Sequence, residues 1–427
     1  MFEEGKKYKL SIIRQENTGR GVAKFNKFPI FIPYALPGEI VEVKISKLKK
    51  SYGEGIIIKQ MTTSKDRIDI PCPYYYSCGG CDLMHQTYKS SLEFKKKNLI
   101  ELLYKFSKIN SNFIRLNNVV STDKNYYYRN KVTFHVQNNK IGFYKENTNE
   151  LVEVDECIII NPIFNIALKI IKKYIKDSGI KSIVMKYGEH TKELMIILET
   201  EKEIEKKLID ELISKIKSVK SIYKSSNNKH KLVYGETHIK EKLLDKTFKI
   251  SPKSFFQINT LQVEKMFSKV SKYLDKEDIN ILDLYCGIGV ISIIINNPKR
   301  KIIGVDIVKD AIKDADLNKE INNAENIEFV ASNVKNVLPV IKKARKNLDV
   351  IILDPPRSGI DKDSINIINE LLPKKIIYIS CNPVTLCRDL NVLKEKYDII
   401  EITPYDLFPL THHVETLTLL KVKNEKK

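Results

Sequence analysis

The chain has 427 residues, 42% of them hydrophobic, and this length exceeds what one core usually organises, which predicts two or three domains. Lys and Arg number 73 against 53 Asp and Glu, and the net charge of +20 favours a polyanionic partner, although an AT-rich genome would also enrich surfaces in Lys and Asn. No apolar run approaches the roughly 18 to 20 residues of a membrane span and the N-terminus lacks a signal-peptide core, so we expect a cytoplasmic protein without a membrane partner.

Residues 1–60 consist of short alternating segments separated by glycines and prolines. This spacing predicts a small five-stranded β-barrel. The segment is itself basic, with 12 Lys and Arg against six acids. Barrels of this kind often bind oligonucleotides on one face, and a purely structural barrel is the alternative.

Three cysteines follow the barrel in the spacing C-x5-C-x2-C, and a fourth lies far downstream: Cys72, Cys78, Cys81 and Cys157. In a reducing compartment such cysteines are more often ligands or nucleophiles than disulfides. Four thiolates suit either tetrahedral zinc or a [4Fe-4S] cluster. Zinc ribbons usually bring two C-x2-C pairs, so the spacing favours the iron-sulfur cluster.

Residues 61–250 predict a central α+β domain. It begins with the cysteines and an expected helix over 87–106, and later alternates β-like runs with Lys-rich amphipathic helices over 164–177 and 202–217. Residues 251–427 then alternate strand and helix, which is the pattern of a doubly wound parallel sheet. The fold class is therefore α/β, with a C-terminal Rossmann-like domain.

Residues 280–292 have the pattern of a strand, a glycine turn and the start of a helix. Gly287 and Gly289 lack a Cβ and allow close approach of a ligand. Asp306 ends the next strand, 17 residues beyond Gly289, where a carboxylate can accept hydrogen bonds from both ribose hydroxyls. An NAD site has the same skeleton. However, the turn lacks the third glycine of the dinucleotide fingerprint, and Asp283 ahead of it suits an ammonium better than a pyrophosphate, so S-adenosylmethionine (SAM) is favoured.

Two further apolar runs, over 350–353 and 376–379, end abruptly in polar residues and prolines, as buried parallel strands do. Asp354 follows the first run and Cys381 follows the second. Ligands of open α/β sheets bind outside the carboxyl ends of the strands, so both side chains are expected at one crevice. A buried structural cysteine is the alternative for Cys381.

Four segments together carry a resemblance to a known family: Asp354–Gly359, Tyr378–Thr385, Phe255–Asn259 and His412–Thr416. They resemble the SAM-dependent RNA uracil-C5 methyltransferases, in particular the 23S ribosomal RNA type with a TRAM domain and an iron-sulfur cluster. Residues 1–60 resemble the TRAM-type RNA-binding barrel found at the N-terminus of that family.

The resemblance implies a role for each matching residue. Cys381 would be the nucleophile that adds to C6 of uracil and turns C5 into a carbon able to attack a methyl group. Glu415 would be the base that removes the C5 proton afterwards. The implied cofactor contacts are Gln257, Tyr285, Asp306 and Asp354. The chain departs from the family at Asp306, where Glu is frequent, and at Asn333, where Asp is frequent.

Alternatives remain for both catalytic roles. Cys387 lies six residues after Cys381 and competes as nucleophile, but its surroundings predict the interior of a helix and therefore a packing thiol. His412 and His413 adjoin Glu415 and compete with it as base, and all three would also suit a strand cap.

The resemblance also favours a [4Fe-4S] cluster over zinc and a structured RNA as partner, 23S ribosomal RNA before the tRNA T-loop. Because uridine is stacked within RNA helices, the target is expected in a loop or flipped out. We expect a monomer. Two other hypotheses are an amino-group methyltransferase, which Asp354 and Cys381 in their motifs disfavour, and a non-catalytic iron-sulfur RNA-binding protein.

Overall fold

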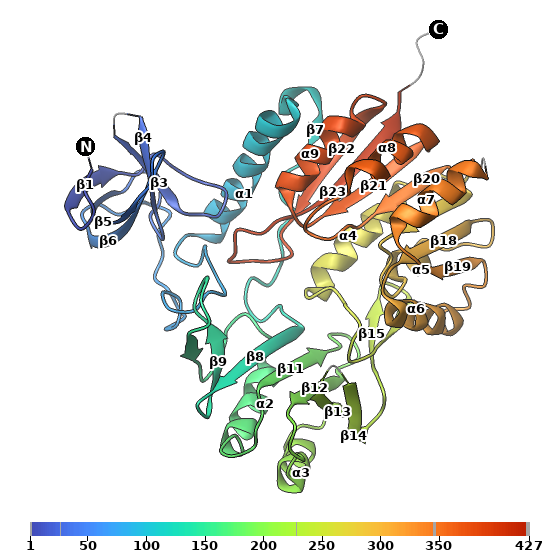
Figure 1. Ribbon diagram of the computed structural model, residues 1–427, viewed down its shortest axis with the longest axis horizontal. Helices are drawn as coiled ribbons and strands as arrows, with labels where there is room; N and C mark the ends of the chain where they lie inside the picture. Colours follow the sequence, from blue (N-terminus) through green and yellow to red (C-terminus); the bar gives the residue numbers. More distant parts are fainter. Residues whose placement is uncertain (1, 26, 228, 345–346, 424–427) are drawn as a thin grey trace. The chain divides into compact units, whose positions relative to one another are not determined.

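The computed structural model describes residues 2–25, 27–227, 229–344 and 347–423 (Figure 1). The chain divides into two compact units, one formed by residues 1–101 with 408–413 and the other by residues 102–407 with 414–427. None of the described helices has the length and apolar character needed to cross a membrane. The domain boundaries expected near residues 60 and 250 stay predictions.

The first unit contains a six-stranded sheet in the order β1-β5-β6-β4-β3-β2. The strands are β1 (Lys7–Ser11), β2 (Arg14–Gln15), β3 (Gly21–Phe25), β4 (Phe28–Ile32), β5 (Ile40–Leu48) and β6 (Gly53–Gln60). Their inward side chains form a core that includes Ile30, Val41 and Val43. Five strands were expected, and the sixth is the two-residue β2, which is too short for its alternation to show in the sequence. Helix α1 (Tyr88–Leu102) follows and ends in a π-helical turn over Leu103–Ser107, close to the expected bounds.

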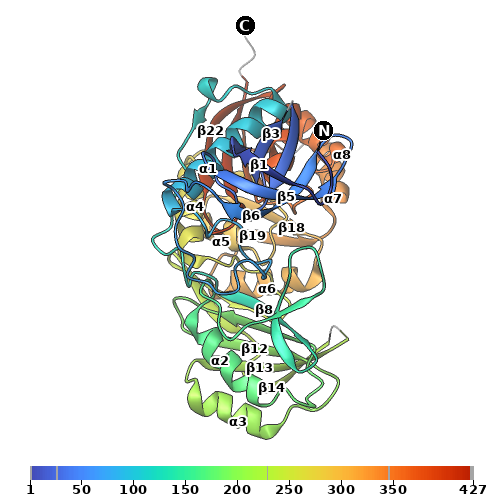
Figure 2. The same ribbon diagram turned by 90° about the vertical axis from the view of Figure 1, so that its left-hand side faces the viewer.

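The second unit contains a seven-stranded mixed sheet in the order β10-β9-β8-β11-β12-β13-β14. Its strands are β8 (Lys131–Gln137), β9 (Lys140–Tyr144), β10 (Leu151–Glu153), β11 (Ser182–Tyr187), β12 (Leu194–Glu199), β13 (Val219–Ser226) and β14 (Lys229–Gly235). Helices α2 (Pro162–Lys173) and α3 (Lys206–Lys215) lie side by side along it (Figure 2). The Phe164 ring of α2 meets the Tyr187 ring of β11 edge-on, so α2 covers the face to which the odd-numbered residues of β11 point. The opposite face carries the even-numbered residues.

A hairpin of β15 (Ile239–Leu243) and β16 (Lys246–Ile250) precedes an eight-stranded sheet in the order β19-β18-β17-β20-β21-β23-β22-β7. Its strands are β17 (Asn280–Leu284), β18 (Lys301–Asp306), β19 (Ile327–Ala331), β20 (Val350–Leu353), β21 (Lys375–Ser380), β22 (Tyr397–Tyr405), β23 (Glu415–Val422) and β7 (Arg115–Leu116). The edge strand β7 comes from far upstream, so this sheet is not built from residues 251–427 alone.

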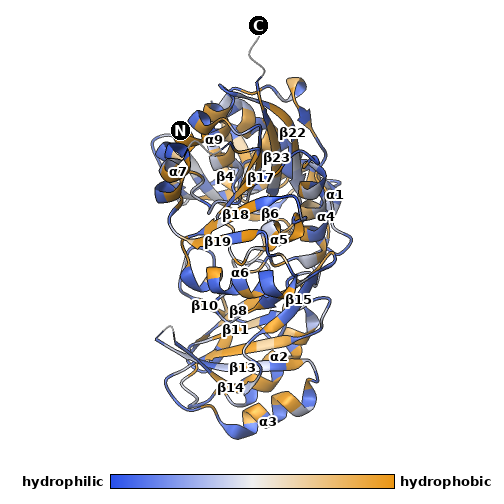
Figure 3. Ribbon diagram, turned by 90° about the vertical axis from the view of Figure 1, so that its right-hand side faces the viewer, coloured by the Kyte–Doolittle hydropathy of each residue, from blue (hydrophilic) through white to orange (hydrophobic). Residues whose placement is uncertain are grey.

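Helices between these strands are α4 (Thr260–Lys272), α5 (Val290–Ile294), α6 (Lys309–Ile321), α7 (Val334–Lys343), α8 (Lys362–Leu371) and α9 (Pro383–Leu393). Every residue of β20 and β21 is buried, as expected for parallel strands covered on both faces. Figure 3 shows hydrophobic colour along β22 and β23 in the same sheet. Strands β17, β18, β19, β20 and β21 run parallel, and β17 lies between β18 and β20. The chain order reverses at β17, and a ligand crevice is expected at the carboxyl ends there.

Candidate active site

A small hollow opens at the carboxyl ends of β17 and β20. Its volume is about 60 Å³, and its lining includes three of the four predicted cofactor residues, Gln257, Tyr285 and Asp354. Asn130, which immediately precedes β8, anchors the segment that carries Gln257. Its side-chain amide donates to the Gln257 carbonyl at 3.0 Å and to Thr260 Oγ1 at 2.8 Å. The lining also includes the glycine turn, so the structure brings the predicted strand ends and the turn together.

The glycine turn after β17 has an unusual backbone. Tyr285 has a φ of 65°, which is rare for a bulky residue, and Gly287 and Gly289 have φ values of 54° and 79°. A Cβ on Gly289 would lie 2.4 Å from the Phe329 ring, so a side chain cannot be accommodated there. Asp306 lies outside the hollow's lining but is tied to the turn, since the Gly287 N–H donates to Asp306 Oδ2 at 3.0 Å.

The Asp354 carboxyl lines the hollow, and the fully buried Asp283 carboxyl lies near enough to act on its pKa. Burial, opposed by the Ser292 hydroxyl that donates to Asp283 Oδ2 at 2.6 Å, raises the pKa of Asp283 to about 7. Burial, followed by repulsion from Asp283, raises the pKa of Asp354 to about 7. Asp283 Oδ1 is buried and has no hydrogen-bond partner among the described residues. Such an oxygen is ready to accept a donor from a ligand.

Cys381 and Glu415 lie at the same end of two antiparallel strands, since Cys381 follows β21 and Glu415 is the first residue of β23. The last pair of the β21–β23 ladder is Ser380 opposite Thr416, and Cys381 and Glu415 are the residues that adjoin this pair in the two strands' sequences. Asn382 caps α9 by accepting from the Val384 N–H, so the cysteine sits between the end of a strand and the start of a helix. The Cys381 side chain is half-buried and Glu415 is buried.

Electrostatics couple this pair to Asp354 and Arg357. Burial, then repulsion from Glu415 and Asp354, raises the pKa of the Cys381 thiol to about 11, whereas Arg357 opposes the rise. Burial and Asp354 likewise raise the pKa of Glu415 well above its usual range, again opposed by Arg357. A protonated carboxyl beside the thiol no longer repels a thiolate. A glutamate with a raised pKa is also a better proton acceptor once it is ionised.

The competing residues lie in different settings. Cys387 is fully buried within α9, and burial raises its pKa to about 12, as expected of a packing thiol. His412 and His413 belong to the first unit, where His412 Nδ1 lies 2.7 Å from Asp82 Oδ2 and the His413 ring packs against Phe408. The Nδ1 atom of His412 is therefore already engaged by Asp82.

The predicted cluster cysteines fall in both units. Cys72, Cys78 and Cys81 belong to the first unit, and the Cys78 N–H donates to the Tyr74 carbonyl at 2.7 Å. Cys157 belongs to the second unit, where its backbone is held by the Asn165 side chain. Over the described parts of the chain, no three His, Cys, Asp or Glu side chains are gathered as a metal site.

Two residues of the crevice were assigned no role from the sequence, Arg357 and Phe255. Arg357 follows Asp354 within the same motif, at the end of a strand, and this position was the available signal. Phe255 lines the hollow although the residue is 62% exposed, and its place two residues before Gln257 was the corresponding signal.

The family model described as tRNA (Uracil-5-)-methyltransferase matches residues 87–423, and that of the TRAM domain matches residues 2–58. An uncharacterized RNA methyltransferase of Clostridium acetobutylicum is 36% identical over 97% of this chain and 96% of its own length. One from Staphylococcus aureus is 35% identical, with 97% of each chain covered.

Among solved structures, the fold is similar to that of the Pyrococcus abyssi tRNA (uracil-54, C5)-methyltransferase in complex with S-adenosyl-L-homocysteine. The TM-score is 0.79 and the sequence identity 28%, over 96% of this chain and 99% of that one. These matches confirm the expected N-terminal TRAM domain and the methyltransferase fold. The chain therefore belongs to the tRNA (uracil-5-)-methyltransferase family and is a SAM-dependent RNA (uracil-5-)-methyltransferase with an N-terminal TRAM domain.

Proposed function

We propose that this enzyme methylates C5 of a uridine in structured RNA through a transient covalent bond between Cys381 Sγ and C6 of the ring. The observation that carries the proposal is that Cys381 and Glu415 adjoin the end of the β21–β23 ladder, where Glu415 and Asp354 both act on the pKa of the thiol. A thiol, a carboxyl and a cofactor crevice at one edge are the groups that this reaction requires.

The chain's residues have distinct tasks in this scheme. The Cys381 thiolate forms the S–C6 bond, and the ring electrons move toward C5, which becomes the nucleophile. SAM supplies the electrophilic methyl group. Glu415 then removes the C5 proton, the C5–C6 double bond reforms and the Cys381 thiolate leaves. Because the thiol pKa is about 11 in the free enzyme, few thiolates exist near pH 7, and the positive charge of Arg357 favours the ionised form.

The residues at the crevice fit SAM. Asp306 ends β18, where a carboxylate can accept from ribose hydroxyls, and the glycine turn leaves the backbone open to a ligand. The unpaired Asp283 Oδ1 and the Asp354 carboxyl suit an ammonium group. Gln257 and Tyr285 complete the proposed set of contacts. At about 60 Å³ the hollow is much smaller than the roughly 300 to 1,000 Å³ of typical ligand sites, so it suits only part of the cofactor.

Two RNA targets are proposed, each with its own support. The resemblance of the sequence to the ribosomal branch, with its barrel and cysteine pattern, favours 23S ribosomal RNA. The structural likeness to a tRNA (uracil-54, C5)-methyltransferase favours the tRNA T-loop. Both are structured RNAs, and the net charge of +20 on the protein suits binding to either polyanion. The enzyme is proposed to act as a monomer.

Mass mapping of 5-methyluridine in both RNAs from a gene-deletion strain tests the function and separates the targets. The proposal expects one or more sites to lose the methyl group, and to regain it when the wild-type gene, but not the Cys381→Ala gene, is returned. Unchanged methylation at every site in both RNAs would contradict it.

We also propose that Cys72, Cys78, Cys81 and Cys157 hold a [4Fe-4S] cluster with a structural role. The support is the donor set, because four thiolates are the ligands of such clusters. Iron and sulfide content with visible absorbance of the anaerobically purified protein tests this. The cluster predicts both elements and their loss in Cys78→Ser, whereas zinc without sulfide, or no metal, would contradict it.

A further inference from the structure

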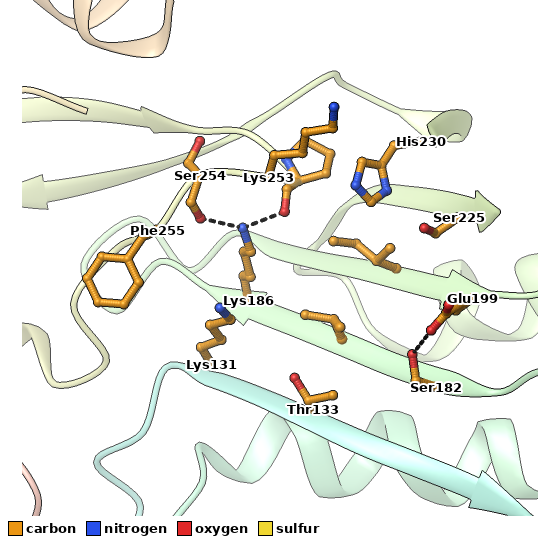
Figure 4. Close-up of a pocket in the computed structure, with 13 residues that line it drawn as sticks. Lys131, Thr133, Ser182, Lys186, Glu199, Ser225, His230, Lys253, Ser254 and Phe255 are labelled. Atoms are coloured by element: carbon orange, nitrogen blue, oxygen red, sulfur yellow. Dashed lines mark hydrogen bonds between the residues drawn. The ribbon is translucent and has the colours of Figure 1, made fainter. Parts of the chain in front are cut away.

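A second pocket, of about 240 Å³, lies on the face of the central sheet opposite α2 (Figure 4). Strands β8, β11, β12, β13 and β14 supply its floor, and the segment that follows β16 supplies its wall. The volume is below the roughly 300 to 1,000 Å³ of typical small-molecule sites, so the pocket suits a small group rather than a whole cofactor. Its lining residues are Lys131, Thr133, Ser182, Val184, Lys186, Ile197, Glu199, Ser225, His230, Pro252, Lys253, Ser254 and Phe255.

The titratable lining is mostly basic. Lys131, Lys186, Lys253 and His230 face one acid, Glu199, whose carboxylate accepts a 2.5 Å hydrogen bond from Ser182. Lys253 is exposed and paired with Asp310 at 3.0 Å. The two lysines that remain within the pocket are Lys131 and Lys186.

These two lysines are direct cross-strand neighbours, Lys186 on β11 opposite Lys131 on β8. Like charges in this position destabilise a sheet unless other groups compensate. Lys186 is compensated, since its Nζ donates to the carbonyls of Ser251, Pro252 and Ser254 at 2.7 to 2.9 Å. Figure 4 draws the bonds to Pro252 and Ser254. Burial, then repulsion from Lys131, nevertheless lowers the pKa of Lys186 to about 7.

Lys131 has no such compensation. None of the hydrogen bonds or ion pairs found within the described residues engages its ammonium group. Burial, then repulsion from Arg129, lowers its pKa. The Nε of Arg129 is itself buried without a hydrogen-bond partner inside the described ranges. A half-buried ammonium group beside two other cations is an arrangement that an anion would stabilise.

His230 adds a second polar group without a partner. Its Nδ1 atom is buried and makes no hydrogen bond to any residue that the structure describes. Buried polar atoms are nearly always hydrogen-bonded, and an exception at a pocket wall indicates a missing ligand or water. Ser225 and Thr133 place hydroxyl groups on the same lining. The pocket thus presents hydrogen-bond donors together with positive charge.

The pocket lies beside the cofactor crevice, and this position favours an anionic group of the RNA substrate as its ligand. Phe255 lines both this pocket and the hollow that contains Gln257, Tyr285 and Asp354. A group bound beside Lys131 would therefore lie next to the cofactor crevice, where the target nucleotide must enter.

We propose that this pocket binds a phosphodiester group of the RNA backbone close to the target uridine, with the Lys131 ammonium as its charged contact. The inference rests on the proposed RNA methylation, because it takes the anion to be part of that substrate. Phosphate oxygens match the donors present, and contacts of this kind fix the position of an RNA without reading its sequence.

The salt dependence of RNA binding tests the proposal. The probes are 23S ribosomal RNA and a tRNA, both transcribed without modified nucleotides, titrated against the full-length protein over a series of salt concentrations. Lys131→Gln removes the charge and Lys131→Arg keeps it. The matched control is Lys207→Gln, which removes an exposed lysine of α3, outside the pocket. Circular dichroism and thermal unfolding confirm that each variant is folded.

Each phosphate contact contributes about 0.7 to 0.9 to the slope of log affinity against log salt. We expect Lys131→Gln to reduce the slope by about that amount and to weaken binding roughly three- to ten-fold at low salt, with Lys131→Arg and Lys207→Gln close to wild type. An unchanged slope in Lys131→Gln on both RNAs overturns the proposal, as does the absence of RNA binding by the wild type. If inorganic phosphate stabilises the wild type against unfolding while the slope stays unchanged, the pocket holds a free anion instead, which also overturns it.

Methyl transfer to the same transcripts is measured in parallel to separate the two proposals. Methylation by the wild type with an unchanged slope in Lys131→Gln would remove only the phosphate pocket. RNA binding with the expected change of slope, but without 5-methyluridine on either transcript, would remove the proposed function and leave a binding pocket.

Discussion

Glu415 and Cys381 both adjoin the Ser380–Thr416 pair that ends the β21–β23 ladder, and the Glu415 carboxyl, after burial, is the largest contributor to the raised pKa of the Cys381 thiol. An ionised Glu415 therefore opposes ionisation of the thiol. A neutral Glu415 permits a thiolate, and an ionised Glu415 accepts a proton. This order matches a reaction in which nucleophilic attack precedes removal of the C5 proton.

The first prediction concerns Glu415→Gln. Glutamine has a similar shape but cannot remove the C5 proton, so the methylated adduct forms and does not resolve. We expect turnover to fall by about 10² to 10⁴-fold and an RNA–protein adduct to persist on a denaturing gel. Cys381→Ala is the control without any adduct. Wild-type turnover in Glu415→Gln would assign the base to another residue.

Arg357→Gln removes the positive charge that lowers the pKa of Cys381. The thiol pKa should therefore rise above about 11, and the limb of the pH–rate profile along which the rate increases with pH should move to higher pH. Alkylation of Cys381 by iodoacetamide as a function of pH measures the shift directly. Lys362→Gln, an exposed change on α8, is the control. A pKa that stays the same or falls would show that Arg357 does not act on the thiol.

Cys387→Ala separates the two neighbouring cysteines. Cys387 is fully buried, so its truncation should lower the free energy of unfolding by roughly 1 kcal/mol. Adduct formation through Cys381 should continue in the folded fraction. Denaturant unfolding and adduct trapping measure the two effects, and loss of trapping in a folded Cys387→Ala protein would reopen the choice of nucleophile.

Asp306→Asn tests the proposed ribose contact. The side chain keeps its size but loses its charge, and charge-assisted hydrogen bonds are about twice as strong as neutral ones. We expect the Kd for SAM to rise roughly ten-fold, with little change in RNA affinity. Calorimetric titration with SAM measures the effect, and an unchanged Kd would place the ribose elsewhere.

The buried Asp283 gives the free enzyme a specific pH dependence. Its pKa is raised from 3.8 to about 7 in the folded state, so the folded protein holds a proton that the unfolded chain releases. The stabilisation is complete below about pH 3.8 and is lost as the pH rises through about 7. Asp283→Asn should therefore reduce the fall in Tm between pH 5 and 8. An equally steep fall in the variant would show that Asp283 is not protonated in the native state.

Local patterns in the sequence predicted many of these strands and helices, because the burial of a strand is written in its own run of residues. The apolar runs over 350–353 and 376–379 are strands β20 and β21 because buried parallel strands are apolar throughout. The helix expected over 202–217 begins only at Lys206, since the charged residues before it carry no strong capping signal. Strand β7 was missed because two residues have no detectable period, and its pairing with β22 depends on the tertiary fold.

The residues of the candidate site also fall into those that the sequence could predict and those that it could not. Residues at strand ends, such as Asp354 and Cys381, were accessible from the sequence because a topological rule places them at one edge. The electrostatic effect of Arg357 on Cys381 could not be predicted from the sequence, because it depends on the path of the loop that follows β20. The facing pair of Lys131 and Lys186 was also hidden, since only the register of β8 against β11 brings two lysines 55 residues apart into contact.

The most direct test of the central claim uses RNA that contains 5-fluorouridine at the target position. The fluorine at C5 cannot leave as a proton does, so the methylated ring should stay bonded to the enzyme. With SAM present, we predict an adduct that survives denaturation, and peptide mass spectrometry should place the RNA on Cys381. An adduct on another residue, or no adduct with an RNA that the enzyme methylates at the unfluorinated uridine, would contradict the account.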